Sequence, residues 1–257
     1  MSGQPQQLDL HFIASRLEGM EETIIAKLID RAQFAANDIA YTPGKSGFTG
    51  ESHRSLFDLR MLHHEKMDAP FGRFCVPEER PFTGNLPPPQ REVTLPDSGL
   101  KIDDLEKVNF TGSIKPAYLH LVRQICPAGD DGQYGSSVEH DVYAIQAVSR
   151  RIHFGAFYVA ESKILAEPEA FRGPIADRDE AAIEALLTRR DVEERIIERI
   201  YRKTIETQRG VNRELRNVVD AETIVQFYRD TVIPVTKKGE VAYLLHRSVA
   251  TSATQSA

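Results

Sequence analysis

The spacing of apolar residues predicts long helices at both ends of the chain. Apolar residues recur every three or four positions over 8–37, with charged residues between them, which is typical of an amphipathic helix. Proline and glycine end this pattern, and a shorter helix is expected over 52–68. A last helix is expected to begin after Asp220 and to end near His246. Pro234 lies inside it and predicts a kink, because proline has no amide hydrogen to donate.

The middle of the chain alternates between segments rich in proline or glycine and helical segments. Six of the 14 prolines lie within 77–99, so this segment is expected to be extended, as an ordered wrapping loop or as a linker between two domains. A glycine-rich loop is expected over 126–137, and Ser136 or Ser137 would cap the helix after it. Further helices are expected over 114–125, 138–166, 179–187 and 189–208, the last with Thr188 as its N-cap.

The pattern as a whole predicts an all-α protein. No strand-like alternation of useful length and no internal repeat occurs, and several expected helices exceed the average length of about 11–12 residues. The expected fold class is therefore a multi-helix bundle. We expect one domain over 1–257, with disordered tails at 1–7 and 248–257.

Composition excludes several classes of function. The 257 residues include 32 Lys+Arg and 38 Asp+Glu, a net charge of −6, so there is no basic footprint for nucleic acid. Two cysteines cannot form a disulfide scaffold or a four-cysteine zinc site. No apolar run approaches the ~20 residues that span a bilayer, and the N-terminus lacks the pattern of a secretory signal. We therefore expect a cytoplasmic protein with no membrane or nucleic-acid partner.

Three segments, in this order and spacing, carry a resemblance to a known family. They are MEETIIAKLIDRAQF (20–34), the stretch 129–163 that contains SRRIHFG, and VIPVTKKGEVAYLLHR (232–247). Together they resemble the allosteric chorismate mutases of fungi and plants. The resemblance implies an all-helical homodimer that rearranges chorismate to prephenate in phenylalanine and tyrosine biosynthesis. It also implies a unimolecular reaction that uses no cofactor, metal or covalent intermediate.

The resemblance assigns five catalytic residues. Arg151 matches an arginine that binds a substrate carboxylate, and Lys163 matches a lysine that donates to the ether oxygen and a carboxylate. Glu193 matches a glutamate that accepts from the ring hydroxyl. Thr236 and Glu240 match a pair on the final helix, where their i, i+4 spacing places them on one face. Such residues suit this chemistry, since chorismate carries two carboxylates and the breaking C–O bond leaves negative charge on the ether oxygen.

The match at Glu240 implies a pH dependence. The residue at this position contacts the ether oxygen in the family, and a carboxyl group can donate a hydrogen bond only when it is protonated. The pKa of Glu240 is therefore expected to be raised, and activity to fall as pH rises through that pKa.

The sequence departs from the family pattern at the expected substrate-binding cations. Ala14 stands where the family has an arginine that contacts a substrate carboxylate. Arg16 lies two positions later, about 200° around the helix, and is not an obvious substitute. Arg189 stands where fungal members have asparagine, and we hypothesise that it supplies the missing charge. Arg150 is a further candidate for binding the substrate.

The spacing of Arg151 and Lys163 also departs from the pattern. The two residues are twelve positions apart, whereas eleven is usual in the family, and the extra residue adds about 100° of helical rotation. A π-bulge would absorb the extra residue and keep both side chains on one face. Otherwise one of the two assignments is wrong.

The predicted effector site is only partly retained. In the fungal family, tyrosine and tryptophan bind between subunits, and here Arg73, Gly135 and Ser136 match residues of that site. Gly72 replaces an arginine of the pattern, and Glu139 replaces a threonine. A tyrosine or tryptophan effector is therefore a possible partner, beside chorismate and a second copy of the chain.

Two other functions compete with chorismate mutase activity. The altered cations would also suit the same fold acting on isochorismate or an amino-chorismate. A non-catalytic homologue with a regulatory or partner-binding role is the other alternative. The five retained catalytic residue types count against it, because an inactive site has no need to keep them.

Overall fold

The computed structural model describes residues 8–210 and 214–248, and it contains no strand within them. The all-α class expected from the sequence is therefore confirmed for this part of the chain. The expected tails lie outside the described residues, apart from Ser248. The amide of Ser248 donates to the carbonyl of Lys101 at 2.7 Å.

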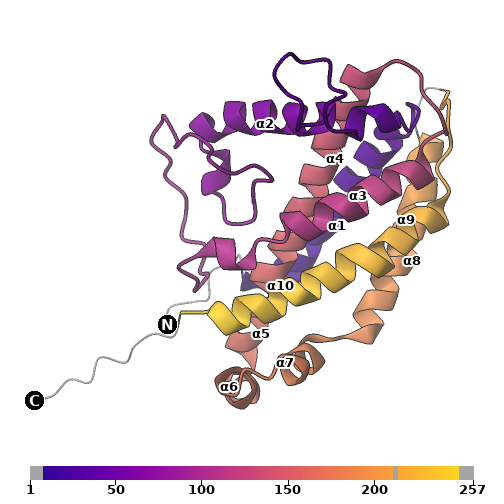
Figure 1. The fold of residues 1–257 in the computed structure, drawn as a ribbon. Coiled ribbons are helices and arrows are strands. Elements are labelled where there is room, and N and C mark those ends of the chain that lie inside the picture. The colour runs from indigo at the N-terminus through magenta and orange to yellow at the C-terminus, as the bar shows by residue number, and fades with distance from the viewer. Residues whose placement is uncertain (1–7, 211–213, 249–257) are drawn as a thin grey trace, which may run out of the picture.

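Two long helices, α1 (Leu10–Arg31) and α4 (Tyr134–Phe154), pack along each other at the centre of the bundle. In Figure 1, α3 and α10 cross in front of them, α2 lies across the top, and α6 and α7 lie at the bottom. The other α-helices are α2 (Leu56–Asp68), α3 (Thr111–Ile125), α5 (Ala160–Ala166), α6 (Pro168–Ala176), α7 (Glu180–Leu187), α8 (Arg190–Gly210), α9 (Ala221–Phe227) and α10 (Ile233–His246).

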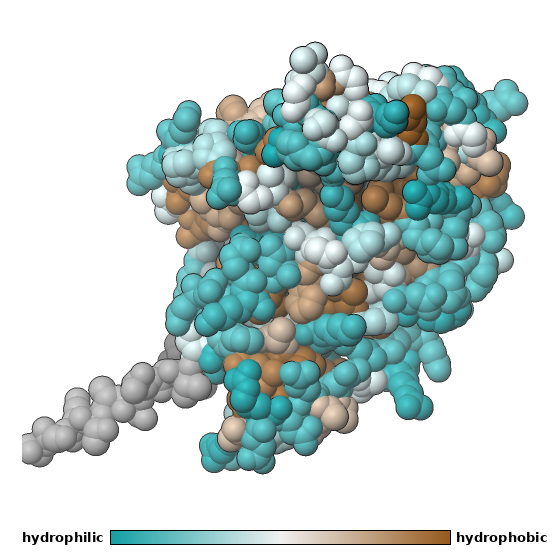
Figure 2. Space-filling model, in the orientation of Figure 1, coloured by the Kyte–Doolittle hydropathy of each residue, from teal (hydrophilic) through white to brown (hydrophobic). Residues whose placement is uncertain are grey.

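Buried apolar residues form two clusters along this bundle. The larger packs α1, α3, α4 and α9 around residues such as Leu28, Tyr118 and Ile145. The smaller joins the start of α1 to α7 and α10 around Phe157 and Tyr243. Figure 2 shows a mostly hydrophilic outer face, with hydrophobic residues in the seams between helices. Both clusters join residues from helices that are far apart in the sequence. The helices therefore stabilise one another by burying apolar surface area at their contacts.

The first helix ends at Arg31, six residues before its predicted end at residue 37. The Arg31 guanidinium donates to the carbonyls of Ala35 at 3.0 Å and Ala36 at 3.2 Å. The chain therefore turns around this buried side chain instead of continuing as a helix. A 3₁₀ segment, Asp38–Tyr41, follows.

Side-chain caps move several other boundaries from their predicted positions. Ser55 and Asp58 form a reciprocal capping box, so the helix predicted over 52–68 begins at Leu56. Neither Ser136 nor Ser137 is a cap, because both lie inside α4, which begins at Tyr134. Thr188 does not cap α8 as predicted. Its hydroxyl donates to the carbonyl of Glu184 at 2.8 Å, at the end of α7.

Sequence analysis did not predict helix α6. This helix begins at Pro168, which suits a first helical position because the missing amide hydrogen would have no partner there anyway. Gly173 and Pro174 lie inside it, and both are residue types that usually interrupt helices. Proline at the start of a helix was the signal that could have identified it.

The proline-rich segment 77–99 is irregular, as predicted. Its first part is held against the bundle, because the Glu65 carboxylate accepts hydrogen bonds from the amides of Phe82 at 2.9 Å and Thr83 at 2.8 Å. Gln90 donates its amide to the carbonyl of Pro70 at 2.8 Å. These contacts favour the ordered wrapping loop over the linker between domains.

Candidate active site

A π-helical segment, Gly155–Val159, joins α4 to α5 without a break. Hydrogen bonds in such a segment span five residues instead of four, so it absorbs one extra residue within a continuous helix. The predicted π-bulge between Arg151 and Lys163 is confirmed. A second π-helical segment, Tyr228–Val232, joins α9 to α10 directly before Pro234, where a kink was predicted.

The π-helical segment lets Arg151 and Lys163 reach the same face of α10. Arg151 Nη1 donates to Thr236 Oγ1 at 3.0 Å, and Lys163 Nζ lies 3.6 Å from Glu240 Oε2. Thr236 and Glu240 are one helical turn apart. Because sequence analysis predicts these four residues to be catalytic, we call Arg151, Lys163, Thr236 and Glu240 the catalytic cluster. The structure therefore brings together four of the five residues predicted to be catalytic.

Two glycines allow α10 to approach the π-helical segment this closely. A Cβ atom at Gly155 would lie 2.8 Å from Thr236 Cγ2, and one at Gly239 would lie 2.6 Å from the Cβ of Ala156. Neither position could hold a larger side chain without separating the two helices. The distance between Arg151 and Thr236 therefore depends on glycine at both contacts.

Arg151 lies in a buried network that sequence analysis did not identify. Its side chain is 3% exposed, and Nη2 lies 3.8 Å from Glu21 Oε1. Glu21 in turn accepts from Arg199 Nε at 2.8 Å and Nη2 at 3.0 Å. The Cζ atom of Arg151 also lies 6.0 Å from the centroid of the Tyr228 ring. Glu21 and Arg199 are 178 residues apart, so no local pattern could have paired them.

Glu240 is buried among these cations and holds a raised pKa. Burial raises the pKa of its carboxyl group to about 7, although the positive charges of Lys163 and Arg151 oppose the shift. Glu240 Oε2 has no hydrogen-bond partner among the described residues, since its distance to Lys163 is too long for one. Near neutral pH this carboxyl group can carry a proton and donate it in a hydrogen bond, as expected from the sequence.

Two neighbouring helices contribute to the surroundings of the catalytic cluster: α7 contacts Lys163, and α8 carries Glu193. Lys163 Nζ also donates to the carbonyl of Leu187, the last residue of α7. Glu193, in the first turn of α8, lies 2.7 Å from Lys237 Nζ through Oε1. Because Lys237 follows Thr236 on α10, this ion pair places Glu193 at the border of the catalytic cluster. Lys237 was not among the predicted residues.

The three other predicted substrate-binding cations do not join the catalytic cluster. The side chain of Arg189 is 66% exposed and lies 3.5 Å from Asp191. Arg16 and Arg150 line a separate cavity between α1, α4 and the proline-rich loop. Ala14 is exposed one turn before Leu17, whose side chain packs near Gly155 and Arg151.

The predicted effector residues do not meet within one chain. Arg73 lies 2.6 Å from Asp68 and 3.1 Å from Glu79, and it donates to Gln146 at 2.8 Å. Ser136 lies ten residues before Gln146 on α4, which is roughly 15 Å along the helix. Gly135 is one residue further away, so a single chain does not place Arg73 beside either residue.

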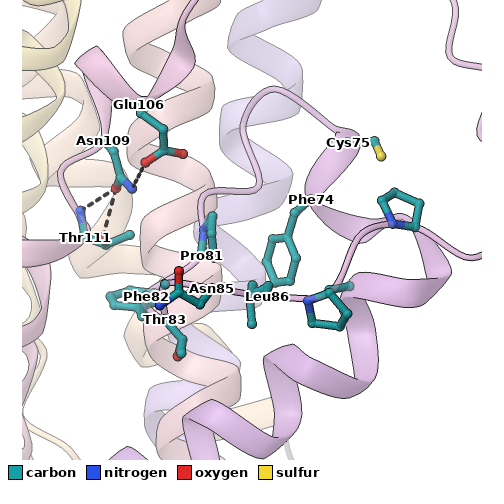
Figure 3. A pocket seen from close by; sticks show the side chains of 14 residues that line it. Phe74, Cys75, Pro81, Phe82, Thr83, Asn85, Leu86, Glu106, Asn109 and Thr111 are labelled. Carbon is teal, nitrogen blue, oxygen red and sulfur yellow. Dashed lines mark hydrogen bonds between the residues drawn. The ribbon is translucent and has the colours of Figure 1, made fainter.

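Another cavity, of about 490 Å³, lies under the proline-rich loop and holds none of the predicted residues. Figure 3 shows Phe74, Pro81 and Leu86 on its walls. Its polar groups pair with one another, since Asn109 donates to Glu106 at 3.0 Å and accepts from the Thr111 hydroxyl at 2.8 Å. The cavity therefore offers few free polar groups to a ligand.

A search of the described residues finds no cluster of histidine, cysteine, aspartate or glutamate side chains that could hold a metal ion. None of the helices in the described part of the chain is long and apolar enough to cross a membrane.

Comparison with known proteins identifies relatives over nearly the full chain. The chain is 38% identical over 249 residues to a chorismate mutase of Schizosaccharomyces pombe, an alignment that covers 94% of this chain and 97% of the relative. Its fold is similar to that of a Candida albicans chorismate mutase in complex with L-Trp, with a TM-score of 0.86, 33% identity, and 94% and 92% of the two chains covered. The AtCM1 structure with phenylalanine in its allosteric site gives a TM-score of 0.82 at 31% identity, covering 95% and 98%. No family model matches the sequence.

Proposed function

Because the chain belongs to the chorismate mutase family, we propose that its catalytic cluster, together with Glu193, rearranges chorismate to prephenate. The observation that carries this proposal is a pair of buried atoms that have no hydrogen-bond partner among the described residues. They are Arg151 Nε, a donor, and Glu240 Oε2, a carboxyl oxygen that has only the 3.6 Å contact with Lys163. Buried polar groups are normally hydrogen-bonded, so such atoms mark the place where a bound substrate would complete the network.

The free donor of Arg151 suits a substrate carboxylate. Its Nη1 is already held by Thr236 at 3.0 Å, which fixes the plane of the guanidinium before the substrate binds. A carboxylate that accepts from a buried arginine gains a charge-assisted hydrogen bond, roughly twice as strong as a neutral one. Binding in this fixed geometry also holds the substrate in its compact reactive form, which removes conformational entropy before the reaction.

Lys163 and protonated Glu240 suit the ether oxygen. Negative charge develops on this oxygen as the C–O bond breaks, so donors aimed at it bind the transition state more tightly than the ground state. One such donor is worth about 10²–10³ in rate in a buried site. The positive charge of Lys163 and the raised pKa of Glu240 supply two donors 3.6 Å apart. Glu193, which pairs with Lys237 at the border of the cluster, would accept from the ring hydroxyl.

Incubation of the purified protein with chorismate tests the proposal directly. Loss of the diene absorbance would be followed, and the product would be identified as prephenate by its conversion to phenylpyruvate in acid. Turnover that disappears in Arg151→Ala and persists in Lys238→Met, an exposed position on α10, would support it. Turnover that survives in Arg151→Ala would place the active site elsewhere.

Parallel assays with isochorismate and amino-chorismate test the alternative substrates. These substrates are tested because Ala14 replaces an arginine that was expected to contact a substrate carboxylate. Faster turnover of either one than of chorismate would favour this alternative. Binding of chorismate without turnover of any of the three substrates would favour the non-catalytic homologue.

We further propose a homodimer with a tyrosine or tryptophan effector between its subunits. Arg73 and Ser136 are too far apart in one chain to form a single site, which supports a site shared by two copies. Met67 and Phe71, near the end of α2, are 58% and 68% exposed and would suit burial at such an interface. Light scattering would test the dimer, and rate measurements with added tyrosine and tryptophan would test the effector.

A further inference from the structure

A cavity of about 520 Å³ lies between α1, α4 and the proline-rich loop, separate from the catalytic cluster. Arg16 from α1 and Arg150 from α4 line it, and so does Glu78 from the start of the proline-rich loop. None of the residues of the catalytic cluster reaches it. Its volume falls within the range of about 300–1,000 Å³ that is typical of small-molecule sites.

The cavity holds one carboxylate and one guanidinium with unused bonding capacity. Glu78 is 4% exposed, and its Oε2 has no hydrogen-bond partner among the described residues. Its Oε1 has only a long contact, 3.5 Å, with Arg150 Nη2. Arg150 is already engaged by Glu79 at 3.2 Å. Arg16, by contrast, makes no ion pair with a described residue, and its Cζ lies 5.9 Å from the centroid of the Phe154 ring.

Aromatic side chains form an apolar wall beside these charges. The rings of Phe154 and Tyr158 stack with their centroids 4.5 Å apart, and Phe12 lines the same cavity. Burial raises the pKa of Tyr158 far above its usual range, so its hydroxyl stays protonated. No other described residue forms a hydrogen bond with that hydroxyl. The wall therefore adds one neutral donor to a surface that suits an aromatic or aliphatic group.

We propose that this cavity binds a small zwitterion of the α-amino acid class with an apolar side chain. Arg16 would take the carboxylate, Glu78 Oε2 would accept from the ammonium group, and the side chain would pack against Phe154 and Tyr158. A dianion such as chorismate fits poorly, because Glu78 and Asp97, which also lines the cavity, would repel its second carboxylate. The site lies within one chain and shares no residue with the predicted effector site at Arg73, Gly135 and Ser136.

Isothermal titration with L-phenylalanine, 3-phenylpropanoate and phenethylamine tests the proposal on the full-length protein. The last two probes lack the ammonium group and the carboxylate respectively. We expect Glu78→Gln to weaken binding of L-phenylalanine at this site at least tenfold and to leave 3-phenylpropanoate unchanged. Arg16→Gln should weaken both of these probes and leave phenethylamine unchanged. Arg172→Gln, which alters an exposed arginine on α6, is the matched control and should bind every probe as the unaltered protein does.

The stoichiometry separates this site from any second site for the same amino acid. If L-phenylalanine also binds elsewhere, Glu78→Gln should remove one binding event per chain and leave the other. Because Arg16 is exposed, Arg16→Gln is expected to fold even if Glu78→Gln does not. Equal affinity and stoichiometry for L-phenylalanine in Arg16→Gln and the unaltered protein, or no binding to the unaltered protein, would overturn the proposal. The readout is binding, so it does not depend on whether chorismate is the substrate.

Discussion

Two buried groups of charges lie on the same central helices, and they differ in how fully their atoms are paired. In the first, which we call the structural cluster, Arg31 and Asp141 are 2.7 Å apart with fully buried side chains. Asp141 also accepts from the hydroxyls of Tyr41 at 2.6 Å and Tyr118 at 2.8 Å. The catalytic cluster lies toward the other end of α4, and two of its buried atoms have no hydrogen-bond partner within the described part of the chain.

The difference separates a group of charges that supports the fold from one that is arranged for a ligand. In the structural cluster each charged group has several partners inside the protein, so it can offset the cost of its burial. In the catalytic cluster Arg151 Nε and Glu240 Oε2 have no hydrogen-bond partner among the described residues, and on our proposal a bound ligand would supply one. We therefore expect substitutions in the two clusters to affect different properties of the protein.

The largest effect is expected from Lys163→Met, which should lower kcat/KM by roughly 10³-fold, or ~4 kcal/mol of transition-state stabilisation. The substitution removes a donor from the ether oxygen but leaves the helical packing in place. Steady-state kinetics measure the first effect, and urea unfolding should show little change in the free energy of unfolding. Lys238→Met, on the exposed side of α10, is the control and should retain full activity. A large loss of stability without loss of activity in Lys163→Met would reverse the roles assigned to the two clusters.

In the structural cluster, Asp141→Asn should lower the free energy of unfolding by about 3–5 kcal/mol, because it leaves the Arg31 charge buried without its counter-ion. The folded fraction should keep a kcat/KM close to that of the unaltered protein. Urea unfolding and kinetics below the new midpoint measure the two properties. Replacing both partners, by Arg31→Met with Asp141→Leu, should restore part of the lost stability. If the single and double variants have the same free energy of unfolding, the loss of stability in Asp141→Asn does not come from the unpaired charge of Arg31.

A smaller effect is expected from pH, through Glu240. Its raised pKa of about 7 means that kcat/KM should fall as pH rises through this value, because the deprotonated carboxyl group cannot donate to the ether oxygen. Glu240→Gln keeps a donor at all pH values and should show a flat profile. If kcat/KM of Glu240→Gln falls with pH in the same way, Glu240 is not the group whose deprotonation lowers activity.

The same pKa also links Glu240 to stability. The folded state holds a proton on Glu240 between the ordinary pKa of 4.5 and about 7, whereas the unfolded state has lost it. This contribution to the free energy of unfolding is therefore fully present below about pH 4.5 and is lost as pH rises through 7. Glu240→Gln should remove this part of the pH dependence in urea unfolding.

The smallest effect is expected from Arg189→Ala. The sequence suggested that Arg189 replaces the arginine missing at position 14, but its side chain is 66% exposed and is directed to Asp191. We expect kcat/KM to change by less than about twofold, since an exposed ion pair contributes little. A loss of tenfold or more would restore the hypothesis that Arg189 binds the substrate.

The helix positions, and the shared face of Thr236 and Glu240 on α10, could be predicted from the sequence because both depend on local spacing. The amphipathic repeats identified most helices to within a few residues, and the i, i+4 spacing placed Thr236 and Glu240 on one face. The family resemblance selected Arg151 and Lys163, which the structure brings to that face. The extra residue between them predicted either a π-bulge or a wrong assignment, and the structure has a π-helical segment there.

The sequence by itself determined the all-α class, the family and four members of the catalytic cluster. Tertiary structure alone decided that Glu21 lies beside both Arg151 and Arg199, that Arg16 and Arg150 line another cavity, and that Arg189 lies outside the cluster. The physical reason is that helical periodicity is a property of neighbouring residues, whereas burial and ion pairing depend on which helices pack together. Glu21 of α1 and Arg199 of α8 pair only because those two helices pack against each other.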